Sequence, residues 1–407
     1  MRILVVAPHP FYIDRGTPID VDILVRALCE QGHEVHLATL HAGADRDYPG
    51  LTIHRIREPN GVGMLSPGFS RDKLRCDARL FGLVWKLVKQ LKPDVLHAGE
   101  EAVFIATAVK RRFGIPYVYD MDSSIAQQMV EQNGSLSRAA GVFNWFERQA
   151  IRGAVACAPV CNALADLARE QGAQRLVTLH DISQLDVGSL RSTGWLREKL
   201  GITSGVVVVY CGNLQPYQGV DLLVEATKVA ADDDADIHTV IAGGDDDHIA
   251  EYEAKCTRIG IHQRVRFIGR WPADKLGDLL IEGDILAAPR IRGINTPQKV
   301  FPYLHTGKPV IVTDLPTHSQ ILDQSVCRLA PPDRVSFGRA LKELAQDEAE
   351  RARLGDAGRR FAESQHTYPS HAARVAELYG IVRDTLESGQ TPAAEHAGAT
   401  PDEDAAA

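Results

Sequence analysis

Polar and glycine residues follow several short apolar runs in the second half of the chain, and their types suit a negatively charged ligand. Glycine lets backbone amides approach a ligand closely, and a guanidinium or ammonium group can neutralise a diphosphate. Asparagine, glutamine and threonine side chains add hydrogen bonds. The candidate ligand-binding residues of this half are Asn213, Gln218, Gly243, Gly244, Arg290, Asn295, Thr296 and Lys299. Arg292 is a further candidate cation beside Arg290.

Some of these residues also have a plain structural interpretation. Arg290 and Arg292 would be surface charges of a loop, and Asn295 and Thr296 would cap a helix that begins at Pro297. Both interpretations stay open at the level of sequence.

A second group of candidate residues lies in the first half of the chain. Arg15, Gly16 and Thr17 precede Pro18 and open an expected helix, whose N-terminal amides would face a ligand. We interpret Gly16 as a point of close backbone approach, where a Cβ atom would intrude on the ligand or strain the turn. A simple tight turn is the alternative.

His97, Glu101 and Asp122 also follow apolar runs of the first half. His97 and Asp122 are the candidate catalytic residues, because an imidazole can transfer a proton and a carboxylate can hydrogen-bond a sugar hydroxyl. Glu101 is a candidate substrate-binding residue. Helix capping by Asp122, and a place for Glu101 in a first helical turn, are the alternatives.

Metal binding has little support in the sequence. Asp120 and Asp122 have the spacing of a metal-binding pair, and Cys157 and Cys161 are close in sequence, but no further ligands complete either set. We therefore expect no metal. The number of cysteines, seven, is odd and they follow no framework spacing, which favours reduced thiols.

Strand and helix patterns alternate twice along the chain. The first series covers apolar runs near residues 2–7, 34–38, 94–97, 116–120 and 154–160, and the second begins near residue 205. Such alternation predicts parallel sheets with helices on both faces, so we expect an α/β fold of two Rossmann-like, doubly wound domains. The first strand is not followed by G-x-G-x-x-G, which disfavours a nicotinamide dehydrogenase.

Composition narrows the class of protein further. The formal net charge of −8 argues against binding to nucleic acid, which requires an excess of basic residues on one face. No signal peptide and no apolar run of about 18 residues is visible, so we expect a cytoplasmic protein. Contact with a membrane surface stays open.

Several longer motifs resemble those of the family 4 glycosyltransferases over about residues 1–385. The segment Gly212-Asn213-Leu214 with Gln218-Gly219 is similar to the family's Gly-Arg-Leu and Lys-Gly. The segment from Pro297 to Val310 is similar to its Pro-x-Lys-x-x-Glu-Tyr block, and Arg15-Gly16-Thr17 and Gly32-His33-Glu34-Val35 match its N-terminal half.

The resemblance implies a GT-B fold, in which the two domains face one another across a cleft. It implies transfer of a sugar with retention from a nucleoside-diphosphate sugar, a co-substrate rather than a cofactor, to a small-molecule, glycan or lipid-linked acceptor. The expected domains are 1–183 for the acceptor and 184–365 for the donor. Residues 366–387 would form a helical segment packing back on the first domain, and 388–407 a disordered tail.

The sequence also departs from the family pattern. Asn213 and Gln218 stand where the family has Arg and Lys, and Ile294 and Pro302 stand where it has two glutamates. These replacements resemble those of a subgroup that lacks the two-glutamate motif. The departures keep two alternatives open: a sugar-nucleotide epimerase or hydrolase on the same fold, and a non-catalytic nucleotide-sugar-binding protein.

Overall fold

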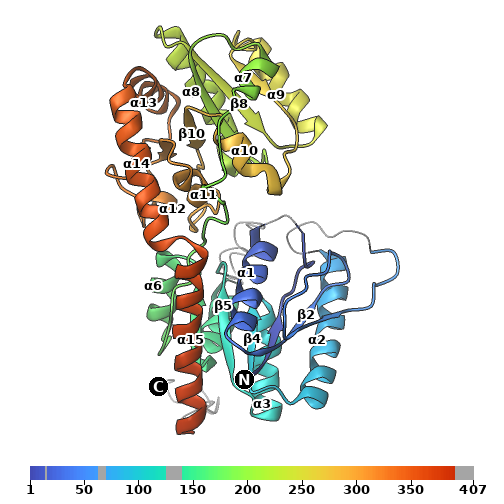
Figure 1. Cartoon of the computed structure of the whole chain (residues 1–407). Coiled ribbons are helices and arrows are strands. Elements are labelled where there is room, and N and C mark those ends of the chain that lie inside the picture. The colour runs from blue at the N-terminus through green and yellow to red at the C-terminus, as the bar shows by residue number, and fades with distance from the viewer. Residues whose placement is uncertain (14–15, 63–69, 125–139, 390–407) are drawn as a thin grey trace, which may run out of the picture.

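Two α/β halves lie one above the other in the computed structural model, which describes residues 1–13, 16–62, 70–124 and 140–389 (Figure 1). Each half is built on a six-stranded, all-parallel sheet. Helices cover both faces of each sheet, as parallel sheets require. The predicted fold class, two doubly wound Rossmann-like domains, is confirmed.

The N-terminal sheet has the strand order β3-β2-β1-β4-β5-β6. Its strands are short apolar runs buried on both faces, with the edge strand β3 only partly buried. The bounds are β1 Arg2–Val6, β2 Glu34–Thr39, β3 Leu51–Arg55, β4 Val95–Gly99, β5 Tyr117–Met121 and β6 Ala156–Pro159, with helices α1 Gly16–Glu30, α2 Arg71–Leu91, α3 Ala102–Phe113, α5 Ala140–Gly153 and α6 Asn162–Gln171.

The C-terminal sheet has the strand order β12-β11-β10-β7-β8-β9. The strands are β7 Val206–Cys211, β8 Ile237–Ala242, β9 Val265–Phe267, β10 Ile285–Ala288, β11 Val310–Thr313 and β12 Arg328–Ala330. The helices are α7 Trp195–Leu200, α8 Val220–Asp232, α9 Asp246–Arg258, α10 Leu276–Leu280, α11 Val300–His305, α12 Pro316–Ser319, α13 Arg334–Gln346 and α14 Glu348–Gln365, with short 3₁₀ turns at Pro216–Gln218 and Ala273–Lys275.

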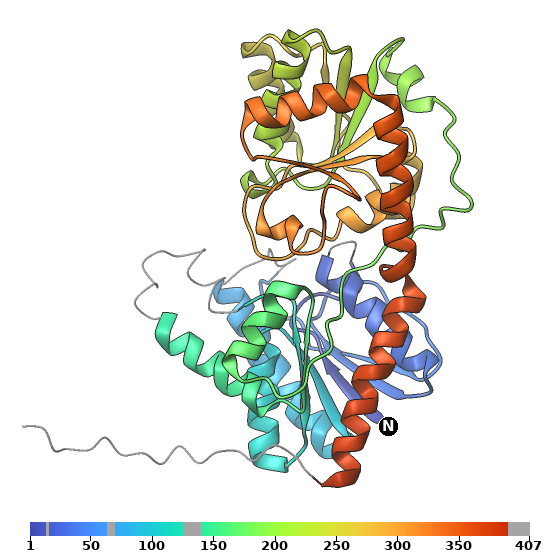
Figure 2. The same ribbon diagram turned by 90° about the vertical axis from the view of Figure 1, so that its left-hand side faces the viewer.

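The chain passes between the halves twice. Residues around 180–194 lead from the first sheet to the second, and the last helix, α15 (Tyr368–Ser388), returns from α14 to lie along the first half (Figure 2). Helix α15 packs on α1 and β6. Its buried residues Val375, Leu378, Tyr379 and Val382 share one apolar cluster with α1 and the strands beneath.

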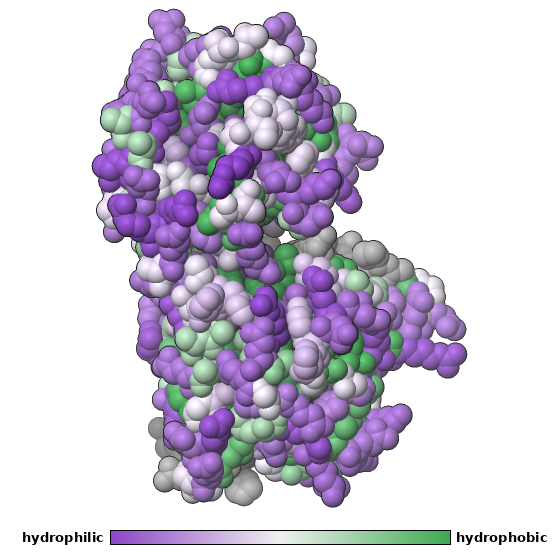
Figure 3. Space-filling view, in the orientation of Figure 1, coloured by the Kyte–Doolittle hydropathy of each residue, from purple (hydrophilic) through white to green (hydrophobic). Residues whose placement is uncertain are grey.

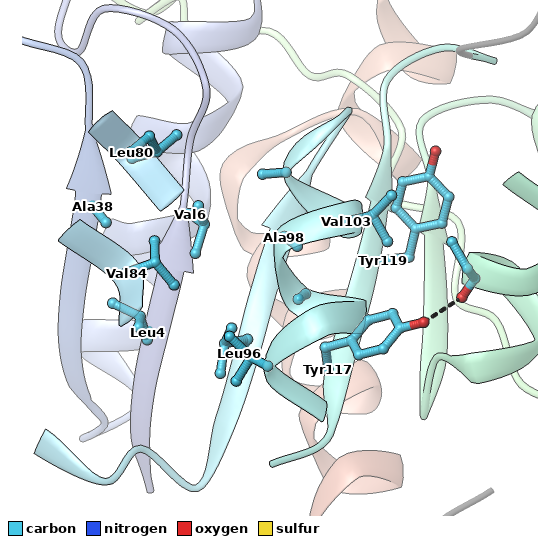
Figure 4. Packing of buried hydrophobic residues seen from close by; sticks show 14 of the residues in the cluster. Leu4, Val6, Ala38, Leu80, Val84, Leu96, Ala98, Val103, Tyr117 and Tyr119 are labelled. Atoms are coloured by element: carbon cyan, nitrogen blue, oxygen red, sulfur yellow. Dashed lines mark hydrogen bonds between the residues drawn. The ribbon is translucent and has the colours of Figure 1, made fainter. Parts of the chain in front are cut away.

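Each sheet separates two apolar clusters. In the first half, α2, α3 and α5 cover one face and α1 and α15 the other. Figure 4 shows the first of these clusters, where the buried Tyr117 hydroxyl donates to the Ala150 carbonyl at 2.7 Å. The satisfied hydroxyl explains how a tyrosine is accommodated in this core.

The structure contains elements that the sequence patterns did not predict, namely β3, α2, α6, α7, α9, β12, α13 and α14. One predicted boundary is wrong: the helix expected from Pro297 begins at Val300, with Lys299 at its N-cap position. Within the described ranges, no helix is long and apolar enough to cross a membrane.

Candidate functional site

The loop between β10 and α11 reaches from the C-terminal half to the N-terminal half. The Gln298 side chain donates to Asp20 Oδ1 at 2.6 Å, and the Asn295 amide donates to the Asp122 carbonyl. The molecular surface is notched between the two halves beside this contact (Figure 3). Residues at the carboxyl ends of both sheets are thereby brought to one region, where ligands of open α/β sheets bind.

Lys299 is the central cation of the C-terminal side. Its Nζ donates to the Tyr210 hydroxyl and to Gln218 Oε1, each at 3.0 Å, and lies 4.1 Å from the centre of the Tyr210 ring. Within the described part of the chain it has no carboxylate partner. Burial lowers the pKa of this ammonium group to about 7. A half-buried cation held only by neutral groups is suited to receive an anion.

Glycines at the neighbouring strand ends are packed against backbone. A Cβ on Gly243, whose φ is +126°, would lie 1.8 Å from the Gly212 carbonyl oxygen. A Cβ on Gly212 would lie 2.3 Å from Lys299 Nζ, and one on Gly244 would lie 2.5 Å from Leu214 Cδ1. A larger residue would have to move backbone at Gly243, and the side chains of Lys299 or Leu214 at Gly212 or Gly244.

Arg290 and Thr296 complete this side. The Arg290 Nε donates to the Arg292 carbonyl at 2.7 Å, and its guanidinium lies 5.4 Å from the centre of the Tyr217 ring. Thr296 is buried, and its hydroxyl has no hydrogen-bond partner among the described residues. We call Lys299, Arg290 and Thr296, with the glycines at 212 and 243, the basic rim.

Three other predicted residues of this half lie less centrally. Asn213 is exposed and accepts from the Gln215 amide at 3.2 Å, and Arg292 is also exposed. Asn295 and Thr296 do not cap a helix at Pro297, because α11 begins three residues later. The capping interpretation of Asn295 is therefore wrong, and its amide instead joins the two halves through the Asp122 carbonyl.

His97 lies behind the N-terminal side of the site rather than in the open. Its Nδ1 is 3.0 Å from the Tyr379 hydroxyl and its Nε2 is 3.1 Å from Asp120 Oδ2, and its side chain is 1% exposed. Both ring nitrogens are thus occupied by protein groups. Proton exchange between His97 and a ligand would have to pass through Asp120.

Glu101 lies at the N-cap position of α3 without capping it, and pairs with Lys73. Its neighbour Glu100 has a left-handed backbone, with φ of +46°. Burial, followed by the charge of Glu101, raises the pKa of Glu100 to about 8. Glu100 is not among the predicted site residues, because a glutamate before a helix is ordinary.

A cavity at the carboxyl edge of the first sheet is lined by four carboxyl groups. We call it the carboxylate pocket; it has a volume of about 20 Å³, room for about one water-sized group, and is lined by Asp20, Asp120, Asp122, Asp181, His180 and His371 together with apolar residues of α1 and of the crossing segment. Of these residues, only Asp122 belongs to the predicted site. The others come from helices and segments far apart in sequence, and only the fold brings them together.

Three carboxyl groups of the pocket have raised pKa values. Burial, then the charge of Asp181, raises the pKa of Asp20 well above its usual range. Burial and the neighbouring Asp120 do the same for Asp122, and burial raises the pKa of Asp181 to about 7. Asp20 and Asp181 share a hydrogen bond, which requires a proton on one of them.

The predicted Arg15-Gly16-Thr17 turn is described only in part, because Arg15 lies outside the described residues. Gly16 begins α1, and Thr17 is half-buried in its first turn. A Cβ on Gly16 would contact only Gln298 Oε1, at an ordinary 3.5 Å, and φ is not positive. The interpretation that a Cβ would strain this turn is therefore wrong.

No group of three or more His, Cys, Asp or Glu residues that could hold a metal ion occurs in the described part of the chain. This includes Asp120 and Asp122, whose carboxyl groups line the pocket. The acidic run 245–247 has a structural role, since Asp245 caps α9 by accepting from the His248 amide at 3.1 Å.

Comparison with known proteins identifies families and relatives that this chain resembles. The family model described as "Glycosyl transferase 4-like domain" matches residues 16–180, and that described as "Glycosyl transferases group 1" matches residues 205–347. A D-inositol 3-phosphate glycosyltransferase of Corynebacterium glutamicum is 26% identical over 235 residues, which cover 54% of this chain and 53% of the relative.

A second relative from Corynebacterium glutamicum is a GDP-mannose-dependent monoacylated alpha-(1-6)-phosphatidylinositol monomannoside mannosyltransferase. It is 28% identical over 201 residues, which cover 45% of this chain and 49% of the relative. The chain thus spans about half the length of the curated relatives it matches.

Solved structures match over nearly the whole chain. Sucrose-phosphate synthase from Thermosynechococcus elongatus has a TM-score of 0.76 at 15% identity, covering 95% of this chain and 99% of that one. HepE from Anabaena in complex with UDP has a TM-score of 0.74 at 15% identity, covering 93% and 100%. At this identity the likeness shows the fold. The two family models together match about three quarters of the chain, which therefore belongs to the family 4 glycosyltransferases of GT-B fold.

Proposed function

We propose that this protein transfers a glycosyl group, with retention, from a nucleoside-diphosphate sugar to a hydroxyl group of an acceptor. The observation that carries the proposal is Lys299, a half-buried cation whose two hydrogen-bond partners are neutral. A diphosphate would supply the missing anion and hold the lysine in its charged form.

The basic rim would bind the donor. Lys299 and Arg290 would contact the diphosphate, and the unpartnered Thr296 hydroxyl would donate to it. The close packing of Gly212 and Gly243 leaves their backbone exposed to a ligand, since no side chain stands in the way. Gln218 would orient the Lys299 ammonium group through their hydrogen bond.

The N-terminal side would bind the acceptor. Asp122 would accept a hydrogen bond from an acceptor hydroxyl, and His97 would act as a positioning residue that orients Asp120. In transfer with retention, the leaving diphosphate oxygen can take the acceptor proton on the same face of the sugar. The protein then supplies orientation and charge stabilisation rather than a carboxylate nucleophile.

We also propose that residues 1–183 bind the acceptor and residues 184–365 bind the donor, with 366–387 packing back on the first domain. The tail expected at 388–407 lies, from residue 390 on, outside the described residues. We also propose that the chain represents a subgroup without the two-glutamate motif. In support, Pro302 is buried within α11, and the Ile294 carbonyl accepts from Gln320 Nε2 at 2.7 Å, so backbone and amide contacts occupy the place of the carboxylates.

We also propose that the protein contacts a membrane surface. Helix α5 carries Val142, Trp145 and Phe146, which are 56%, 48% and 48% exposed. Aromatic side chains of this kind favour the interface of a bilayer. Trp145→Ala combined with Phe146→Ala should reduce co-sedimentation with anionic lipid vesicles, and unchanged co-sedimentation would contradict this part.

The donor site is tested by calorimetric titration of the full chain with UDP and with GDP. Lys299→Ala and Arg290→Ala should each weaken the preferred nucleotide about tenfold or more, the effect of losing a charge-assisted hydrogen bond. Lys275→Ala, which removes an exposed lysine of the same half, is the matched control and should change nothing.

Unchanged affinity in Lys299→Ala would contradict the donor site. Mass spectrometry of products from a panel of donors and acceptors then separates the activities. Free sugar or an epimer formed without acceptor would replace transfer by hydrolase or epimerase chemistry. Tight nucleotide binding without turnover of any donor would favour a non-catalytic binding protein.

A further inference from the structure

The carboxylate pocket has the opposite charge to the basic rim, and this difference bears on the acceptor. Asp20, Asp120, Asp122 and Asp181 converge on one cavity. Among the described residues, its lining contains no lysine and no arginine. Like-charged carboxyl groups at close range, without a countercharge, destabilise one another.

The protein groups nearest the pocket only partly satisfy these carboxyls. Asp20 accepts from Gln298 Nε2 at 2.6 Å, and Asp120 faces His97 Nε2 at 3.1 Å. The nearby cation Arg374 contacts the lining residue His180, with its Nη1 2.5 Å from His180 Nδ1, and forms no ion pair with the described carboxyl groups. No ion pair neutralises Asp122 or Asp181 within the described part of the chain.

His371 provides an independent sign that the pocket receives a ligand. Its side chain lines the cavity and is 7% exposed. Neither ring nitrogen has a hydrogen-bond partner among the described residues; the His180 backbone lies beside the ring without completing a bond. Because burial lowers the pKa of His371 to about 4, the ring is neutral at pH 7 and adds no countercharge. Buried polar groups left unpaired are uncommon in native proteins, and a bound polar ligand accounts for them here.

We infer that the carboxylate pocket binds the acceptor through an ammonium group, so that the acceptor class is a polyhydroxylated primary amine such as an amino sugar or an aminocyclitol. The inference rests on the proposed function and deepens it by naming the substrate class. The ammonium group would lie among Asp20, Asp122 and Asp181, and His371 would accept from a hydroxyl group. The pocket has room for about one water-sized group, so the ammonium group alone would enter it and the rest of the acceptor would lie outside.

The charge of the pocket argues against two other acceptor classes. A phosphate-bearing acceptor would be repelled by the carboxyl groups, although the two curated relatives carry inositol phosphate and phosphatidylinositol in their names. A neutral polyol would hydrogen-bond the carboxyls but leave their mutual repulsion in place. An ammonium group both donates hydrogen bonds and supplies the missing charge.

The test is binding of small probes to the full chain at pH 7, followed by calorimetry or ligand-observed NMR. Glucosamine and glucose differ in one group only, and glucose 6-phosphate adds a negative charge. We expect glucosamine to bind about tenfold more tightly than glucose, and glucose 6-phosphate to bind most weakly. The double variant Asp122→Asn with Asp181→Asn should abolish the preference. Asp186→Asn, an exposed aspartate of the same crossing segment, is the matched control.

Equal binding of glucosamine and glucose would overturn the inference, as would tighter binding of the phosphate or a preference that survives in the double variant. No binding of glucosamine at a concentration on the order of 10 mM, where even weak ligands register, would also overturn it. The titration with UDP and GDP separates this failure from failure of the proposed function. Nucleotide binding that depends on Lys299, without an amine preference, rejects the amine acceptor and leaves the transferase intact.

Discussion

The two halves of this protein have the same architecture but present opposite chemistry at their strand ends. The basic rim combines tightly packed glycines with a half-buried lysine that lacks an anion, whereas the carboxylate pocket combines half-buried aspartates with no ion-pair partner among lysines and arginines of the described residues. The basic rim depends on glycines, which carry no side chain, whereas the carboxylate pocket depends on several side chains that meet in one place. A repeated fold therefore fixes where ligands bind, while a few residues at the strand ends determine which charge they carry.

The largest expected effect is a difference in stability between glycine substitutions in the two halves. Gly243→Ala should destabilise the protein by roughly 3–5 kcal/mol, because the new Cβ meets the Gly212 carbonyl at 1.8 Å and φ is +126°. Gly16→Ala should leave stability within about 1 kcal/mol of the original, since its Cβ has room and alanine favours helices. Thermal unfolding of both variants measures the difference. Equal melting temperatures would show that the strand ends of the second half are no more tightly packed than the start of α1.

The next effect is the pH dependence of nucleotide binding at the basic rim. A diphosphate binds the charged form of Lys299, whose pKa in the empty protein is lowered to about 7. Affinity for UDP or GDP should therefore fall by up to about tenfold for each pH unit above 7, with uptake of a proton on binding. Calorimetry in two buffers of different ionisation enthalpy measures the uptake.

Lys299→Arg provides the control for this pH dependence, because a guanidinium stays charged throughout the range. Its affinity should be lower but nearly independent of pH between 7 and 9. A pH dependence that persists in Lys299→Arg would assign the proton to another group.

The carboxylate pocket predicts that stability, too, declines as the pH rises. Asp181 has a raised pKa in the folded protein, about 7, so its contribution to stability is fully present below its ordinary pKa near 4 and is lost as the pH rises toward 7. Asp181→Asn should remove this loss and stabilise the protein by on the order of 2 kcal/mol at pH 8. The same substitution should have little effect at pH 4. Urea unfolding at both pH values measures it, and a destabilised variant at pH 8 would mean that Asp181 has a cationic partner.

A smaller effect is expected behind the pocket. Tyr379→Phe removes the hydroxyl that lies 3.0 Å from His97 Nδ1 and should cost about 1 kcal/mol of stability. If His97 orients Asp120, the variant should also raise the KM for the acceptor a few-fold while the nucleotide affinity stays unchanged. A change in nucleotide affinity instead would link α15 to the basic rim.

The smallest expected effect is that of a chelator. Turnover should survive EDTA, because the charges for a diphosphate are supplied by Lys299 and Arg290. Loss of turnover that manganese or magnesium restores would assign Asp120 and Asp122 to a metal.

The sequence predicted those features that depend on a short stretch of neighbouring residues. The strand β7, for example, begins with four consecutive valines and ends in Tyr210 and Cys211 before Gly212, and Lys299 lies in a motif with Pro297. It did not predict α13 or α14, because their surfaces are largely charged and their apolar stripes are short. The edge strand β3 was missed for a similar reason, since most of its five residues are only partly buried.

The carboxylate pocket could not be predicted from sequence, for a different reason. Asp20 belongs to α1, Asp181 to the segment between the halves and His371 to the last helix, so no local spacing connects them. Asp20 offered the one available signal, a carboxylate between Ile19 and Ile23 on a helix that is otherwise mostly apolar. His97 shows the opposite case, because its position in sequence indicated a site but not that Asp120 would stand in front of it.

The return of α15 to the first half has a consequence for how the chain is made. Val375, Leu378, Tyr379 and Val382 cover the face of a sheet whose strands all precede residue 160. During synthesis that face stays uncovered while the whole second half is translated, and apolar surface exposed for so long invites aggregation. We expect the nascent first half to depend on chaperones, and its final core to close only when α15 has left the ribosome.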